Sequence, residues 1–140
     1  MDFKEMIARA KAVVGHRELT GRTSVGSVAA ALLSASGAIY TGINIDTACS
    51  MGFCAEHAAI AAMVTAGESH IIAAVAVDER GKIVPPCGRC RQFMAQLHEE
   101  NHKAQIMVAE DTVVTLDELL PWDWQEARPP EVSNTRKKEI

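Results

Sequence analysis

Two short cysteine segments, far apart in the chain, constrain its fold more than any other sequence feature. The first is Cys54-Ala55-Glu56 and the second is Pro86-Cys87-Gly88-Arg89-Cys90, and each stands where a helical pattern begins. Cysteines three positions apart project from the same face of a helical turn, so Cys87 and Cys90 can share one ion. The positive end of a helix dipole also favours the thiolate form. A fold that joins the two segments would bring Cys54, Cys87 and Cys90 around one Zn²⁺ ion.

Three thiolates leave one position of a tetrahedral zinc ion open, and an open position separates a catalytic site from a structural one. A water molecule bound there becomes acidic near neutral pH, and a nearby carboxylate can take and return its protons. Glu56, close to Cys54 in the sequence, suits this acid/base role. The alternative is a closed site in which His57 is the fourth ligand; such a site would belong to a structural-zinc binding module without chemistry.

Composition and charge exclude several other classes. The chain has 140 residues, of which 48% are hydrophobic and 23% are charged, and this composition is typical of one globular domain. We expect the domain to cover residues 1–126 and the polar tail at 127–140 to be mobile. No apolar run approaches the roughly 20 residues that cross a bilayer, and the charged N-terminus is not a secretory signal, which predicts a cytoplasmic protein. A net charge of −4 argues against binding to nucleic acid polymers or anionic membranes.

Hydrophobic periodicity predicts an α/β domain in which helices cover the faces of a central sheet. Ser36-Gly37 is a turn signal between two predicted strands, and Thr115 with Glu118 forms a capping-box pattern at the start of a short last helix. The predicted longer helices cover residues 1–14, 54–66 and 88–100, and the predicted strands cover residues 24–33, 38–45, 71–77, 106–109 and 113–114.

The stretch TGINIDTACSMGFCAEHAAIAAM, followed by PPCGRCRQFMAQL, resembles the cytidine deaminase superfamily and in particular its small three-cysteine zinc branch. That branch contains deaminases of free nucleosides and the blasticidin S deaminases, and the similarity extends over residues 24–124. The resemblance implies a three-layer α-β-α sandwich with a central mixed five-stranded sheet. It also implies one Zn²⁺ per chain, a small-molecule substrate and a homotetramer in which neighbouring subunits complete each site.

The reaction implied by this resemblance is the hydrolytic deamination of a cytosine-type aminopyrimidine, with Glu56 as the catalytic acid/base and ammonia as a product. The backbone of Ala55 would hold the edge of the pyrimidine. Asn44 and Asp46 match the positions that hold the ribose hydroxyls. Trp124 matches an aromatic position that reaches into the site of a neighbouring subunit.

Three departures from the family pattern bear on the substrate. Gly26 stands where a phenylalanine usually stacks on the base, and Asp46 stands where glutamate is usual. His57 replaces an arginine that offsets the thiolate charge, so His57 or Arg91 is a candidate for that task. We expect a nucleoside substrate such as cytidine or deoxycytidine. The alternative within the family is a blasticidin S-type or other modified cytosine, because loss of the stacking ring opens room for a different substituent.

Overall fold

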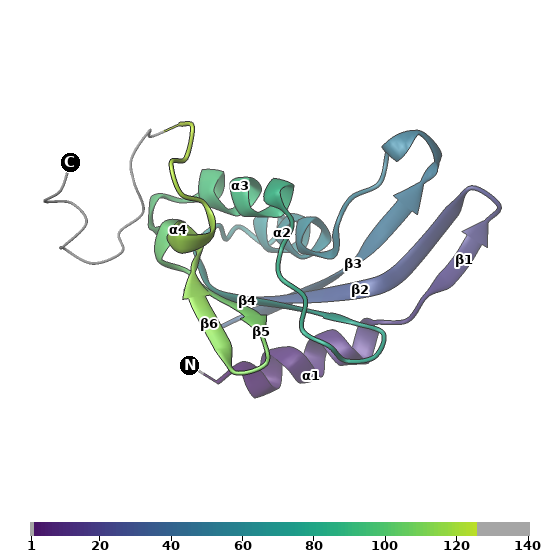
Figure 1. Ribbon diagram of the computed structural model, residues 1–140, viewed down its shortest axis with the longest axis horizontal. Coiled ribbons are helices and arrows are strands. Elements are labelled where there is room, and N and C mark those ends of the chain that lie inside the picture. The colour runs from purple at the N-terminus through teal and green to yellow at the C-terminus, as the bar shows by residue number, and fades with distance from the viewer. Residues whose placement is uncertain (1, 126–140) are drawn as a thin grey trace, which may run out of the picture.

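The computed structural model describes residues 2–125, which form three layers (Figure 1). Helix α1 (Phe3–Val13) covers one face of the sheet, and α2 (Ala55–Thr65), α3 (Gly88–Leu97) and α4 (Leu116–Leu119) cover the other. The predicted three-layer α-β-α sandwich is therefore confirmed. No helix within residues 2–125 is long and apolar enough to span a membrane. The predicted tail, residues 127–140, lies outside the described residues.

The sheet has the five predicted strands and one more. Strand β4 (Ile71–Asp78) pairs with β5 (Gln105–Ala109) in parallel, and the other neighbours are antiparallel, so the sheet is mixed. The additional strand, β1 (Arg17–Thr20), pairs with the beginning of β2 (Thr23–Ser34). All four of its side chains are exposed, so the sequence has no apolar alternation there that would predict a strand. In spatial order the central strands are β3 (Ile39–Thr47), β2 (Thr23–Ser34), β4 (Ile71–Asp78), β5 (Gln105–Ala109) and β6 (Thr112–Thr115).

Strands β2 and β4 supply side chains to two separate cores, because successive residues of a strand point to opposite faces. The core under α1 consists of Phe3, Met6, Ala10, Ala29, Ala31, Ala73, Val75 and Val77. The larger core beneath α2 and α3 includes Leu32, Ala59, Ile60, Met63, Ala74, Cys90 and Met94. The buried cysteine of α3 is thus part of the hydrophobic core, which anchors the second cysteine segment to the sheet.

Helix α2 lies unusually close to β3, and a glycine allows this approach. A Cβ atom at Gly42 would lie 2.3 Å from the backbone nitrogen of Ala59 and 2.7 Å from the carbonyl oxygen of Ala55. Any larger residue at Gly42 would push the helix away from the sheet. The position of the first cysteine segment, at the beginning of α2, therefore depends on this contact.

Helix α3 ends at Leu97, earlier than the predicted range 88–100. His98 has extended backbone dihedral angles, and a 3₁₀ helix (Glu99–Lys103) follows it. The cause is Asn101, which is fully buried and whose amide bonds to the backbone of Met94, Ser69 and Ile71. These bonds satisfy the backbone groups where α3, the 3₁₀ helix and β4 meet, and a continued α-helix could not make them. The capping box at Thr115 and Glu118 is confirmed.

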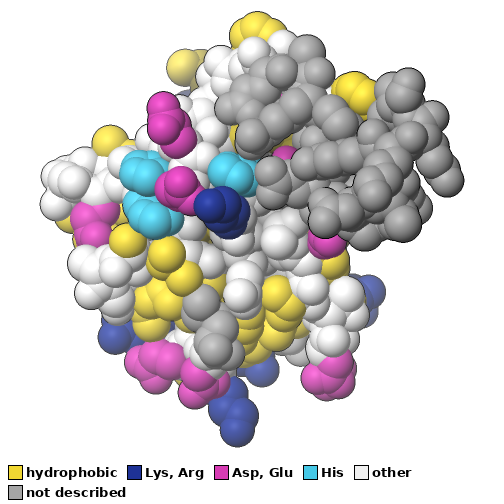
Figure 2. Space-filling model, turned by 90° about the vertical axis from the view of Figure 1, so that its left-hand side faces the viewer, with side chains coloured by type: hydrophobic (Ala, Val, Ile, Leu, Met, Phe, Trp, Pro, Cys, Tyr) yellow, Lys and Arg dark blue, Asp and Glu magenta, His cyan; other side chains and the backbone are white. Residues whose placement is uncertain are grey.

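Figure 2 shows histidine side chains gathered on the face where α3 ends, beside acidic and basic side chains. The rings of His70 and His98 stack with centroids 4.4 Å apart and an interplanar angle of 1°. His102 contacts the carbonyl of Glu99 on the same segment. None of these three histidines lines the cavity described below.

Candidate active site

The N-termini of α2 and α3 bring the two cysteine segments together. Cys54 precedes α2, Cys87 precedes α3, and Cys90 lies in the first turn of α3. The Sγ atom of Cys87 lies 3.4 Å from those of both Cys54 and Cys90, and all three sulfurs lie within 4.8 Å of one another. A tetrahedral zinc ion with Zn–S bonds of about 2.3 Å requires sulfurs about 3.8 Å apart. The three predicted ligands therefore have a spacing that fits zinc.

The pKa values of the three thiols are set by burial and by the groups around them. Burial raises the pKa of Cys90, and the nearby Glu56 and Cys87 raise it further. Burial likewise raises the pKa of Cys54. Burial acts to raise the pKa of Cys87 as well, but hydrogen bonds from the backbone N–H groups at the start of α3 and from the neighbouring thiols outweigh it, so this pKa is lowered. A zinc ion bound by the three sulfurs would displace the thiol protons and compensate the charge of the resulting thiolates.

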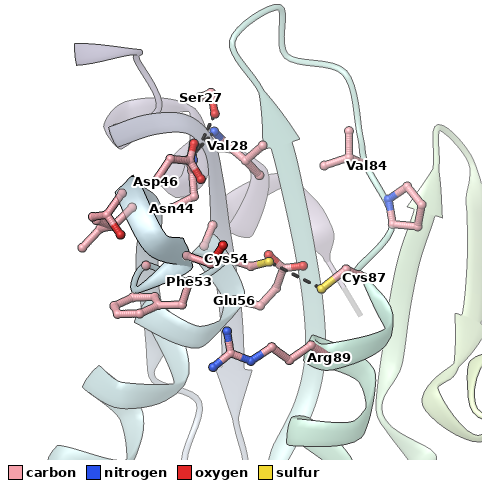
Figure 3. A pocket seen from close by; sticks show the side chains of 16 residues that line it. Ser27, Val28, Asn44, Asp46, Phe53, Cys54, Glu56, Val84, Cys87 and Arg89 are labelled. Atoms are coloured by element: carbon pink, nitrogen blue, oxygen red, sulfur yellow. Dashed lines mark hydrogen bonds between the residues drawn. The ribbon is translucent and has the colours of Figure 1, made fainter. Parts of the chain in front are cut away.

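Glu56 lies beside the sulfurs in the first turn of α2, with a side chain directed into the cavity drawn in Figure 3. The residue is only 6% exposed. Burial raises the pKa of its carboxyl group, while the Cys90 thiol lowers it by a smaller amount. A carboxyl group with a raised pKa holds a proton closer to neutral pH, which is what a group that takes and returns protons needs.

A cavity of about 610 Å³ adjoins the sulfurs (Figure 3). Its 16 lining residues come from β2, β3, the loop before α2, the first turn of α2, the segment before α3 and the first turn of α3. It contains every predicted site residue except two. Cys90 is buried behind Cys87, and Trp124 lies elsewhere, 72% exposed. The lining residues predicted from the sequence are Asn44, Asp46, Cys54, Ala55, Glu56 and Cys87.

Asn44 is held by three hydrogen bonds at the end of the cavity far from Cys87 (Figure 3). Its Oδ1 accepts from the backbone N–H of Val28 at 2.9 Å. Its Nδ2 donates to Ser27 Oγ at 3.1 Å and to Asp46 Oδ2 at 2.9 Å. Both amide hydrogens are used within the protein, so Asn44 orients Asp46, whose carboxylate is exposed toward the cavity. Ser27 was not predicted, because only the pairing of β2 with β3 brings it next to Asn44.

His57 lies beside the three sulfurs without joining them. Its Nδ1 is 3.2 Å from Cys90 Sγ, and its ring lies against Phe93 with centroids 4.6 Å apart. Among the described residues, the cluster of side-chain atoms close enough to bind one metal ion consists of the three cysteine sulfurs and does not include His57. Burial lowers the pKa of His57, and the charge of Arg89 lowers it further. His57 is therefore a hydrogen-bond partner of Cys90 and lies outside the cluster of possible metal ligands.

Arg91, the other candidate for offsetting the thiolate charge, is engaged elsewhere. Its Nε donates to the carbonyl of Pro86 at 2.8 Å, and one terminal nitrogen donates to the carbonyl of Leu119 at 3.2 Å. Arg91 therefore ties α3 to the segment before it and to the end of α4.

Gly26 is excluded as a position for an aromatic ring. It has a φ of +86°, and a Cβ atom there would lie 2.1 Å from the carbonyl oxygen of Gly15. The backbone at Gly26, where β2 contains a bulge, therefore leaves no room for the phenylalanine that is usual at this position. Two lining residues that sequence reasoning missed are Phe53, directly before Cys54, and Arg89, inside the second cysteine segment. Only the direction of each side chain in the fold reveals them.

The family model described as "Cytidine and deoxycytidylate deaminase zinc-binding region" matches residues 3–106 of this chain. The chain belongs to the cytidine deaminase family. It is 37% identical over 98 residues to a cytidine deaminase of Halalkalibacterium halodurans, an alignment that covers 67% of this chain and 74% of that protein. It is 40% identical over 98 residues to a cytidine deaminase of Sporosarcina psychrophila, covering 69% and 70% of the two chains.

The fold agrees with the family. The crystal structure of cytidine deaminase from Mycobacterium leprae superposes with a TM-score of 0.73 at 27% identity and covers 86% of this chain and 98% of that chain. The predicted enzyme class, a zinc-dependent aminohydrolase of cytidine deaminase type, is confirmed by these relationships.

Proposed function

We propose that this enzyme deaminates a cytosine nucleoside such as cytidine or deoxycytidine. The observation that supports this most directly is the layout of the cavity, with the three sulfurs and Glu56 in one part and the Asn44–Asp46 pair at the far end. A pyrimidine whose C4 faces the sulfurs would direct its sugar toward Asp46. The exposed carboxylate would accept hydrogen bonds from sugar hydroxyls, and charge-assisted bonds of this kind are strong.

Zinc held by Cys54, Cys87 and Cys90, one ion per chain, would supply a Lewis acid that makes water nucleophilic at neutral pH. Glu56 takes a proton from the water that attacks C4 and gives it to N3, then takes the second proton from the hydroxyl now on C4 and gives it to the departing amine. The C4–N4 bond breaks, a C4–O bond remains, and cytosine plus water becomes uracil plus ammonia. The backbone of Ala55, which lines the cavity next to Glu56, would hold the edge of the ring.

A modified cytosine of the blasticidin S type is the second candidate substrate. The observation that favours it is Gly26, whose backbone rules out a stacking ring at that position. Asp46, shorter by one methylene than the usual glutamate, also leaves more room at the sugar end. Both features suit a ligand with a different or larger group in place of the ribose.

We also propose that the enzyme works as a homotetramer in which Trp124 serves a neighbouring subunit. Trp124 is 72% exposed and does not line the cavity of its own chain. Trp122, close by, is 60% exposed. Two exposed indole rings so close in the sequence are typical of a surface that contacts another protein subunit.

The experiment that tests the function measures ammonia release and zinc content on the same sample. The substrates are cytidine, deoxycytidine, cytosine, 5-substituted cytosines and blasticidin S. Glu56→Gln should keep zinc and lose about a thousandfold in kcat, since a general acid/base contributes on that order. Glu79→Gln, an exposed carboxylate outside the cavity, is the matched control and should turn over normally. Near-normal turnover by Glu56→Gln would contradict the mechanism, and one zinc per chain with no turnover of any substrate would favour the structural-zinc alternative.

A further inference from the structure

Arg89 is the single Lys, Arg or His side chain among the residues that line the cavity. It projects from the first turn of α3 and is exposed. Within residues 2–125 its guanidinium takes part in no hydrogen bond or ion pair, whereas Arg91, two positions later, is bonded to two carbonyl groups. Five N–H donors are therefore available to a ligand at the wall of the cavity.

The remaining charge of the cavity is negative. Asp46 and Glu56 are its carboxylates, and Cys54 and Cys87 are two of its thiols. A neutral nucleoside needs no cation outside the metal cluster. An anionic ligand, in contrast, would be repelled by these groups unless a cation met it.

The position of Arg89 indicates which part of a ligand it would meet. In Figure 3 the Arg89 side chain lies on the opposite side of Cys54 and Glu56 from Asn44 and Asp46. If the sugar of a bound nucleoside points to Asp46, a group near Arg89 must extend from the pyrimidine ring. The ring carbon C5, next to the reacting C4, is the position from which a substituent could extend to this side.

Space for such a substituent exists beside Arg89. A second hollow of about 410 Å³ also has Arg89 in its lining, so this side chain borders both hollows. The other residues that line the second hollow are His57, Gln92, Phe93 and Gln96. The guanidinium of Arg89, unpaired among the described residues, and the amide of Gln96 supply hydrogen-bond donors to this hollow, which suits an acceptor-rich group such as a carboxylate.

We propose that Arg89 is a specificity residue that binds an anionic substituent on the pyrimidine ring, so that the enzyme prefers cytosine nucleosides with an acidic group at C5. This inference rests on the proposed function, because it assumes that C4 of the ring faces the three sulfurs. A carboxylate matches the planar fork of the guanidinium, which lysine cannot reproduce.

The test compares wild type, Arg89→Gln and Arg89→Lys with three substrates, two nucleosides and one nucleotide. These are 5-carboxycytidine, with the anion on the ring; 5-methylcytidine, with a neutral group at the same position; and cytidine 5′-monophosphate, with the anion on the sugar. The readout is kcat/KM by ammonia release. A second readout is the Kd of the products 5-carboxyuridine and 5-methyluridine by calorimetry, which requires no turnover. Arg80→Gln removes a positive charge outside both hollows and is the matched control.

In the wild type we expect 5-carboxycytidine to be preferred over 5-methylcytidine. Arg89→Gln should lower this ratio about ten- to a hundredfold, the effect of one hydrogen-bonded charge pair, with Arg89→Lys in between and Arg80→Gln unchanged. An equal loss on all three substrates would overturn the proposal, since it would mean that Arg89 acts on the metal cluster. A loss confined to the 5′-monophosphate would also overturn it. If no nucleoside is deaminated, the proposed function fails, and the product affinities still test Arg89 separately.

Discussion

The side-chain amide of Asn44 donates a hydrogen bond of 2.9 Å to the carboxylate of Asp46, two residues further along β3. Residues two apart in a strand lie on the same face, so both side chains meet at the cavity. Asn44 is itself anchored to the neighbouring strand through Val28 and Ser27. The pair therefore couples a buried, rigid amide to an exposed carboxylate that a ligand can reach.

Asp46→Ala should raise the KM for cytidine about ten- to a hundredfold, because a charged acceptor for the sugar hydroxyls is lost. The KM for free cytosine, which has no sugar, should change little. Steady-state kinetics of ammonia release with both substrates checks this. Equal changes for cytidine and cytosine would show that Asp46 acts on the base or on the fold instead of the sugar.

His57→Ala should keep one zinc per chain and lower kcat about tenfold. Once Cys90 is a metal-bound thiolate it can only accept a hydrogen bond, so His57 Nδ1 must donate to it, and removal of such partners typically costs ten- to a hundredfold in metal affinity or activity. His57→Asn, whose amide nitrogen can take the place of Nδ1, should recover part of the activity. Metal analysis beside the kinetics provides the check, and loss of zinc in His57→Ala would support the closed four-ligand site.

Gly26→Ala should lower the free energy of unfolding by about 2–4 kcal/mol, measured by urea denaturation. The new Cβ would collide with the carbonyl oxygen of Gly15, and the residue would keep a positive φ. Gly37→Ala is the matched control, because Gly37 has a φ of +90° in open space and should lose only about 1 kcal/mol. Similar losses at the two positions would contradict the steric argument. Gly26→Phe should not create a stacking surface for the base.

Tyr40→Phe should lower stability near neutral pH and have a smaller effect in acid. The Tyr40 hydroxyl donates to Glu68 and, with Ser36 and Ser34, holds the pKa of that carboxyl below its ordinary 4.5. Because the pKa of Glu68 is lower in the folded protein than in the unfolded chain, the ionised carboxylate stabilises the fold at pH values above the unfolded pKa. This stabilisation is lost as the pH falls through the pKa of the folded protein. The hydrogen bond to Glu68 also raises the pKa of Tyr40, a contribution that is lost in strong alkali.

The difference between wild type and Tyr40→Phe should therefore be largest between about pH 5 and 9 and should narrow toward pH 3. Urea midpoints across this range provide the measurement. A difference that stays constant from pH 7 to pH 3 would mean that the ring packing of Tyr40, and not its bond to Glu68, carries the effect.

The sequence alone determined the features that depend on neighbours along the chain. Cys87 and Cys90 are one helical turn apart, and Glu56 follows Cys54 in a helix whose alanine-rich pattern is plain. The strands covered on both faces could be read as apolar runs, which predicted an α/β domain. The three-layer sandwich and the family were implied by the resemblance that the two cysteine segments carry. The polar strand β1 and the early end of α3 could not, because exposed pairing and the buried amide of Asn101 depend on distant residues.

Only the tertiary structure decided what faces the cavity. The pairing of β2 with β3 sets Ser27 beside Asn44, the start of α3 directs Arg89 to the cavity wall, and the packing of α2 against α3 turns His57 to the Cys90 sulfur. Each of these contacts joins residues well separated in sequence, and each requires strand register or helix rotation to be set first. Register and rotation follow from how two cores are filled together on the two faces of one sheet, a collective property that no single segment of the chain encodes.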